Sequence, residues 1–258
     1  QSELDPSLAV FDAKGTRLVE NDDAAFGRHT SADSLIENWT VPADGTYYVQ
    51  VRDLHQRGGP AFVYALRVTA AEPYFLLEAD TDKTLLAPGM NGVVFVRAYR
   101  KHGFIGDIQL HVDGLPEGVT ARAGRILAGG NDGCIVLETN AKAPRGAANV
   151  RIWGTAEHAL PDGKTLPLEA RAQPLQETYF PGGGRGNYPV NLQSVSVGDP
   201  MDLLAVHVSP REVNLKPGEK ATLTVEIERA EGFDKNVTLD VIMRHLGGIF
   251  GNSLPPGV

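Results

Sequence analysis

The sequence has little sulfur and no clustered histidines. A single cysteine, Cys134, occurs in 258 residues, which excludes an intrachain disulfide framework. Cys134 lies in an apolar run, and this context predicts a buried and unreactive thiol. The seven histidines are scattered, without the spacing of zinc motifs. A GxSxG nucleophile elbow and a complete phosphate-binding loop are also missing. The residue pattern therefore predicts a chain that is not an enzyme.

Long apolar runs and an excess of basic residues are missing as well. No run approaches the roughly 20 apolar residues that a membrane-spanning helix needs. The formal net charge is -8, which disfavours the phosphates of nucleic acid and the anionic surface of a membrane. We therefore expect no nucleic-acid partner and no membrane span.

Glycine and proline are abundant, in contrast, with 29 and 17 residues. Short apolar stretches alternate with turn residues throughout the chain, and no helical period of useful length is present. This pattern predicts an all-β chain of tandem β-sandwich modules.

The first 72 residues contain several predicted strands. A hairpin is expected from residues 35–41 and 47–51 around the turn at 42–45. Apolar and other residues then alternate from Phe62 to Val68, which predicts a half-buried final strand.

Oxygen-bearing side chains gather in this first stretch. Asn21, Asp22 and Asp23 are adjacent, and Asp33 and Asp53 are expected at the same edge of the module. Calcium prefers carboxylate and amide oxygens, so these five residues form a candidate calcium site and Ca²⁺ is the candidate cofactor. The alternative is a solvated turn in which Asp and Asn side chains bond their own backbone.

Five segments of this region carry a family resemblance: DPSLAVFDAKG, NDD, DS, VPADGTYYVQVRD and GGPAFVYALRV. Together they resemble the bacterial pre-peptidase C-terminal (PPC) domain, a small β-sandwich that is appended to secreted peptidases and other exported proteins. The resemblance covers residues 1 to about 70 and implies that the module is incomplete on its N-terminal side. Some members of that family bind calcium, so the resemblance also supports the candidate calcium site.

Residues 73–159 contain further predicted strands at the spacing of an immunoglobulin-like sandwich. Residues 202–258 repeat the start of this module. Pro88-Gly89 precedes Phe104 at the same spacing at which Pro217-Gly218 precedes Phe233, and the motif at 115–119 recurs at 254–258. We expect residues 202–258 to form a second immunoglobulin-like sandwich that is incomplete on its C-terminal side. Residues 160–201 lack a regular period and are predicted to be a linker.

Tandem β-modules without convergent polar residues indicate a non-catalytic role. We interpret the chain as an accessory segment of a larger exported bacterial protein, with a role in adhesion, spacing or partner docking. Its expected partners are other domains of the parent chain or an extracytoplasmic protein, and the expected location is secreted, periplasmic or at the cell surface.

Two alternatives stay open, together with a role as a subunit of a large extracytoplasmic assembly that pairs with its neighbours through exposed sheet edges. The chain can be the ancillary region of a secreted peptidase or other hydrolase. It can also be a carbohydrate-binding module that holds a polysaccharide at Trp39 and Tyr48.

Overall fold

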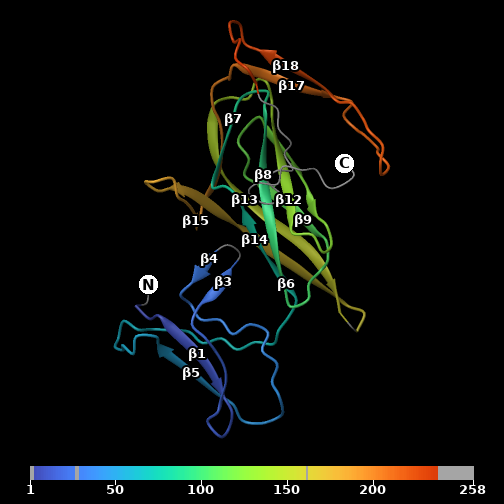
Figure 1. Cartoon of the computed structure of the whole chain (residues 1–258). Coiled ribbons are helices and arrows are strands. Elements are labelled where there is room, and N and C mark those ends of the chain that lie inside the picture. Colours follow the sequence, from blue (N-terminus) through green and yellow to red (C-terminus); the bar gives the residue numbers. More distant parts are fainter. Residues whose placement is uncertain (1–2, 27–28, 161, 238–258) are drawn as a thin grey trace. The chain divides into compact units, whose positions relative to one another are not determined.

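The computed structural model describes residues 3–26, 29–160 and 162–237 (Figure 1). Every regular element in these residues is a β-strand, which confirms the predicted all-β class. The chain divides into two compact units. Unit 1 comprises Gln1–Leu76 and Arg100–Phe104, and unit 2 comprises Leu77–Tyr99 and Ile105–Val258.

Unit 1 is built on a three-stranded antiparallel sheet in the order β2-β1-β5. Its strands and a separate β3–β4 hairpin are β1 (Pro6–Phe11), β2 (Arg17–Asn21), β3 (Ala24–Phe26), β4 (His29–Ser31) and β5 (Tyr48–Asp53). The central strand β1 aligns Leu8 with Val51 of β5. Because side chains alternate along a strand, one face of the sheet carries Pro6, Leu8 and Val51.

The hairpin expected at residues 35–51 does not form. Only its second half becomes a strand, β5, and β5 pairs with β1. Residues 35–41 are irregular, and Asn38 has a φ of 55°. This left-handed conformation interrupts an extended strand, which explains the difference.

Unit 2 contains a β-sandwich whose strands belong to one connected eleven-stranded system, and a separate two-stranded sheet described below. Two of these strands are divided between the units: the first residues of β6 (Tyr74–Ala79) and the last residues of β8 (Asn91–Lys101) belong to unit 1. The others are β7 (Lys83–Leu86), β9 (Ile108–Asp113), β10 (Val119–Ala123), β11 (Arg125–Ile126), β12 (Asp132–Thr139), β13 (Gly146–Ala159), β14 (Thr165–Tyr179), β15 (Arg185–Pro189) and β16 (Gln193–Val197).

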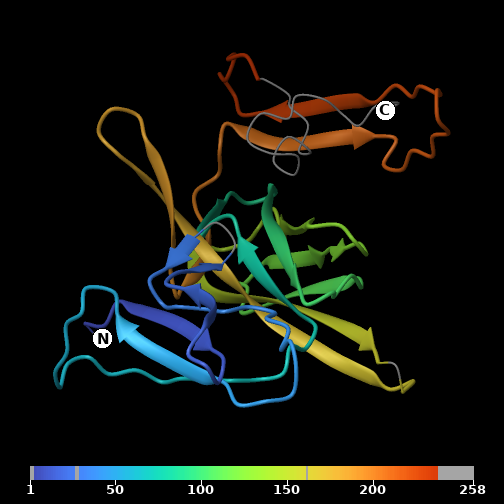
Figure 2. The same cartoon turned by 60° about the horizontal axis from the view of Figure 1, so that its bottom comes forward.

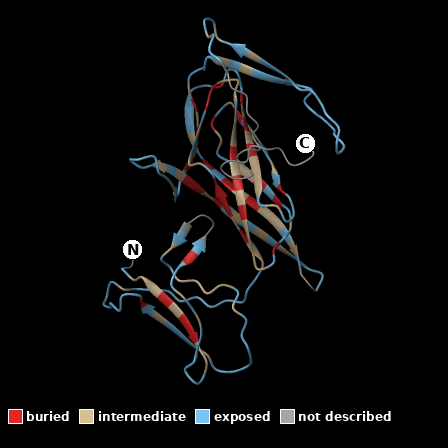
Figure 3. Ribbon diagram, in the orientation of Figure 1, coloured by how far each residue is buried: buried red, intermediate tan, exposed pale blue. Residues whose placement is uncertain are grey.

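Two long strands connect the sheets of this sandwich, as Figure 2 shows for the yellow strand β14. β13 pairs with β16 through its first residues and with β9 and β14 through its later ones. β14 pairs with β13 and then runs parallel to β6. The alternating inward residues form the core, which Figure 3 shows in red. Among them Leu110, Ile135 and Ile152 are at most 2% exposed.

The segment expected to be a linker, residues 160–201, is therefore an integral part of unit 2. It supplies β14, β15 and β16, which pair with β13, β6 and β7. The glycines at its centre form the turn of the β14–β15 hairpin rather than a flexible connection, and Gly182 and Gly183 have positive φ angles.

The last described strands are β17 (Leu203–Ser209) and β18 (Thr224–Arg229), which form a two-stranded sheet. The corner after β18 matches the corner after β8. Gly103 and Gly232 have φ angles of 79° and 80°. The amides of Phe104 and Phe233 donate to the carbonyl three residues earlier, each at 3.1 Å. This shared geometry supports the internal repeat, although the recurring motif at 254–258 lies outside the described residues.

Candidate functional site: an apolar groove in unit 1

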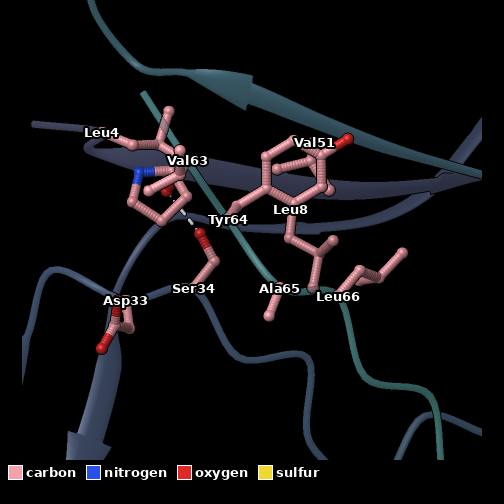
Figure 4. Close-up of a pocket in the computed structure, with 10 residues that line it drawn as sticks. Leu4, Leu8, Asp33, Ser34, Val51, Val63, Tyr64, Ala65 and Leu66 are labelled. Atoms are coloured by element: carbon pink, nitrogen blue, oxygen red, sulfur yellow. Dashed lines mark hydrogen bonds between the residues drawn. The ribbon is translucent and has the colours of Figure 1, made fainter. Parts of the chain in front are cut away.

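The apolar face of the unit 1 sheet forms the floor of a groove with a volume of about 380 Å³ (Figure 4). Pro6 and Leu8 of β1 and Val51 of β5 lie on this floor, and Leu4 precedes them. These side chains share one face because their positions alternate along two strands in register. The floor is therefore fixed by strand pairing and not by loop conformation.

The opposite wall consists of four consecutive residues, Val63, Tyr64, Ala65 and Leu66. The sequence predicts a half-buried strand here, and this prediction is wrong: residues 62–70 are irregular and no described strand pairs with them. The chain is held just before the wall, where the Glu3 amide donates to the Ala61 carbonyl at 3.3 Å. The wall thus crosses the sheet face instead of joining an edge.

The apolar side chains of the wall are strongly exposed. The exposed fraction is 64% for both Val63 and Tyr64, 46% for Leu66 and 77% for Val68. Contiguous exposed apolar groups of this kind mark interaction surfaces in soluble proteins. The alternation of apolar residues in this segment is visible in the sequence and suggests a strand. The sequence alone does not show that the segment pairs with no strand in the described fold.

The polar end of the groove is formed by Asp33 and Ser34. The Ser34 hydroxyl donates to the Pro6 carbonyl, a hydrogen bond drawn in Figure 4. It also contacts the Asp22 carbonyl at 3.4 Å. These bonds hold the loop after β4 beside the start of β1, and the Asp33 carboxylate adds a negative charge to that end.

An ion pair between a buried carboxylate and a half-exposed arginine lies at the end of the floor. Asp53 is 4% exposed, and its oxygens accept bonds from the Arg57 guanidinium at 2.9 and 3.0 Å. It also accepts bonds from the backbone amides of Asp5, His55 and Arg57. The hydrogen bond from the Arg57 side chain holds the pKa of Asp53 well below its ordinary value, against the effect of desolvation. A carboxylate that is satisfied in this way has little capacity left for a metal.

The five residues of the candidate calcium site do not form one cluster. Asn21 ends β2, and its amide donates to the Leu35 carbonyl at 2.6 Å. Asp22 and Asp23 follow it and are exposed, Asp33 lies at the groove, and Asp53 is paired with Arg57. In the part of the chain that the structure describes, no three His, Cys, Asp or Glu side chains come together as a metal site. Asn21, Asp22 and Asp23 keep a local arrangement, and calcium binding there stays a prediction.

The aromatic residues proposed for a polysaccharide also separate. Trp39 packs edge-on against Tyr47, with ring centroids 5.6 Å apart. Tyr48 is the first residue of β5, is 59% exposed and is not part of this ring contact. Cys134 is half-buried, and burial raises the pKa of its thiol, as expected for an unreactive cysteine.

A second polar cluster was not found from the sequence. The Glu37 carboxylate accepts a hydrogen bond from the Tyr74 hydroxyl at 2.9 Å and from Lys101 Nζ at 2.7 Å. His102 Nε2 lies 3.6 Å from the same carboxylate, and His102 Nδ1 is 2.8 Å from the Glu72 carbonyl. These residues are far apart in the sequence, and no motif connects them. These contacts join the loop after β4 to the first residue of β6 and to the residues at the end of β8.

The cluster changes the titration of two of its members. Burial raises the pKa of Glu37, but the hydrogen bonds from Lys101 and Tyr74 lower it by more, so that it lies below its ordinary value. Burial and the bond to Glu37 raise the pKa of Tyr74 to about 12. His102 Nε2 is buried and has no hydrogen-bond partner among the described residues, whereas the Glu37 carboxylate accepts bonds from both Tyr74 and Lys101. The contacts of Glu37 join separate segments of unit 1, which is a structural role.

Comparison with known proteins assigns neither a family nor a function to the chain. No protein-family model matches the sequence, and no curated protein matches it. One similar solved structure is the ASH/PapD-like domain of human CEP192 (PapD-like domain 7), at 11% identity and a TM-score of 0.27, with 46% of this chain and 100% of that chain covered. Another is the fibronectin(III)-like modules of Clostridium thermocellum CbhA, at 13% identity and a TM-score of 0.22, with 64% and 77% covered.

These scores are too low to assign a function. The described residues contain no helix with the length and hydropathy needed to span a membrane. The resemblance of residues 1 to about 70 to the PPC domain stays a prediction, and the chain is best characterised by its own architecture as an all-β chain with a sandwich in unit 2 and an open apolar groove in unit 1.

Proposed function

We propose that the chain is a non-catalytic accessory segment of a larger exported bacterial protein and that unit 1 docks an extended apolar strand of a partner in its groove. The observation that carries this proposal is the uncovered wall at residues 63–66, which faces an apolar sheet floor across an open volume of about 380 Å³. Burial of such apolar surface against a partner is favourable because it removes the surface from water.

The form of the wall favours an extended strand over a compact ligand. Four consecutive residues line the groove, so the backbone edge of the segment borders it as well as the side chains. Within the described residues, the amides and carbonyls of residues 63–69 make no backbone hydrogen bond to another strand. An incoming strand would pair with these groups and would place alternate side chains against Leu8 and Val51, as in recognition by β-strand addition.

Selection from a library of displayed random octapeptides tests the proposal. We expect the chain to enrich sequences in which apolar residues alternate, because such peptides match the groove. A selected peptide with a fluorescent label should bind the Leu66→Glu variant at least about tenfold more weakly, a loss of about 1.4 kcal/mol.

The matched control is Leu192→Glu in unit 2, which replaces a leucine that is 65% exposed and lies outside the groove. It should bind the peptide like the unmodified chain. Failure to enrich any alternating sequence, or equal weakening by both variants, would contradict a docking role for the groove.

A further inference from the structure

The partner strand that the proposed function requires can be identified more closely from the wall itself. Resting on that proposed function, we infer that the groove of unit 1 is completed by a second copy of this chain, through antiparallel pairing of residues 62–68, the wall with its flanking residues, in the two copies. The wall of one copy supplies the strand that the wall of the other copy lacks.

The wall offers both parts of a strand-pairing surface. Its backbone groups from residue 63 to residue 69 are unpaired within the described fold. The apolar side chains in and just after the wall, those of Val63, Tyr64, Leu66 and Val68, are 46–77% exposed. An unpaired and apolar edge is a template for pairing with another chain, and soluble proteins that keep such an edge exposed commonly use it for association.

The sequence of the wall is complementary to itself in one antiparallel register. When the two segments pair with Ala65 at the centre, Tyr64 of one copy lies opposite Leu66 of the other. Phe62 then lies opposite Val68 on the same face. Pairs of aromatic and aliphatic side chains are among the favourable cross-strand combinations. A two-fold axis through Ala65 makes both halves of this contact identical, which is the isologous geometry of most homodimers.

The single charged residue beside the wall, Arg67, also favours antiparallel over parallel pairing. Arg67 is the only charged residue between positions 61 and 69. In the antiparallel register about Ala65 it lies opposite Val63, and the two arginines are separated along the strands. A parallel pairing in register would place the two Arg67 side chains directly opposite each other, and like charges in that position are destabilising.

A charge-pair experiment at Ala65 tests this register. Ala65 is exposed, so substitutions there are compatible with the folded unit, and circular dichroism checks that the β signal is kept. The unmodified chain should sediment as a dimer. Ala65→Glu and Ala65→Lys should each be monomeric, because each places two like charges opposite each other. A mixture of the two variants should sediment as a dimer again, since the central pair then has opposite charges.

The control variant is Ala123→Glu, which adds the same charge at an exposed alanine at the end of β10 in unit 2 and should leave the dimer intact. A chain that is monomeric at about 100 μM, a concentration at which a dimer with a dissociation constant of about 1 μM would be assembled, would overturn the inference. So would an Ala65→Glu variant that remains dimeric, or a mixture that remains monomeric.

A synthetic peptide of residues 61–69 separates this inference from the proposed function. Self-pairing predicts that the labelled peptide binds the chain and competes with dimer formation. If the chain is monomeric and does not bind this peptide, but does bind the alternating octapeptides from the library, the second copy is the wrong occupant and the docking groove stands. If it binds neither, both proposals fail.

Discussion

Replacement of Glu37 by glutamine provides the sharpest test of how unit 1 is held together. Glutamine keeps the size of the side chain and an acceptor for Tyr74, but it removes the charge that faces Lys101. The Lys101–Glu37 contact is 2.7 Å, and the two side chains are 23% and 27% exposed. Hydrogen bonds to charged groups contribute about 1.5–3 kcal/mol, and loss of one partner of a fully buried pair costs about 3–5 kcal/mol. Because this pair is partly exposed, we expect Glu37→Gln to lower the free energy of unfolding of unit 1 by about 1.5–3 kcal/mol.

The two tryptophans allow this change to be measured in unit 1 alone. Trp39 lies in unit 1 and Trp153 in unit 2, so a Trp153→Phe background leaves Trp39 as the only tryptophan reporter. Urea unfolding followed by its fluorescence should show a midpoint lower by about 1–2 M for Glu37→Gln, given the small m-values of domains of this size.

The matched control is Glu117→Gln, which removes the same charge from an exposed position in unit 2. It should leave the Trp39 midpoint unchanged. A Glu37→Gln shift no larger than that of the control would refute the view that this cluster stabilises unit 1.

Three further results are expected. Because the pKa of Glu37 is lowered in the folded state, the ionised carboxylate contributes its full share of stability above about pH 4.5, the ordinary pKa of the group. This contribution is lost as the pH falls below that value, so the urea midpoint should fall more for the unmodified chain than for Glu37→Gln. Gly118→Ala should cost about 2–4 kcal/mol, because Gly118 has a φ of 79° and an added Cβ would lie 2.6 Å from a neighbouring side chain. Gly15→Ala, at a φ of 82° in open space, should cost only about 1–2 kcal/mol, and equal losses in thermal denaturation would contradict the packing argument. Calcium should raise the melting temperature through Asn21, Asp22 and Asp23, and the rise should disappear in the double variant Asp22→Ala/Asp23→Ala; a rise that persists would place the ion elsewhere.

The sequence predicted the elements whose local pattern and tertiary partners agree. Alternation in β8, β12 and β13 matches strands that are buried on one side, and the Pro-Gly turns matched positive φ angles at Gly89 and Gly218. The prediction of a linker at 160–201 was wrong because pairing with β13, β6 and β7 creates strands where the composition favours irregular structure. Tertiary pairing overrides local propensity in such segments.

The candidate sites depend on contacts that the sequence alone does not reveal. Residues 62–68 have the alternation of a strand, but in the described fold they pair with neither edge strand of the unit 1 sheet, β2 or β5. Asp53 belongs to an acidic set in the sequence, yet Arg57, only four residues away, occupies its carboxylate. Glu37 meets Tyr74 and Lys101 only through the fold. The sequence therefore shows which residues carry carboxylates that could bind a metal. Only the fold shows which of these carboxylates are already paired with a lysine or an arginine.

The long strands β13 and β14 have a mechanical consequence. Each is hydrogen-bonded in more than one part of unit 2, β13 to β16, β9 and β14, and β14 to β13, β15 and β6. The backbones of these two strands therefore link β16, β9, β15 and β6 within one hydrogen-bonded system. We therefore expect the eleven-stranded part of unit 2 to unfold cooperatively when it is pulled.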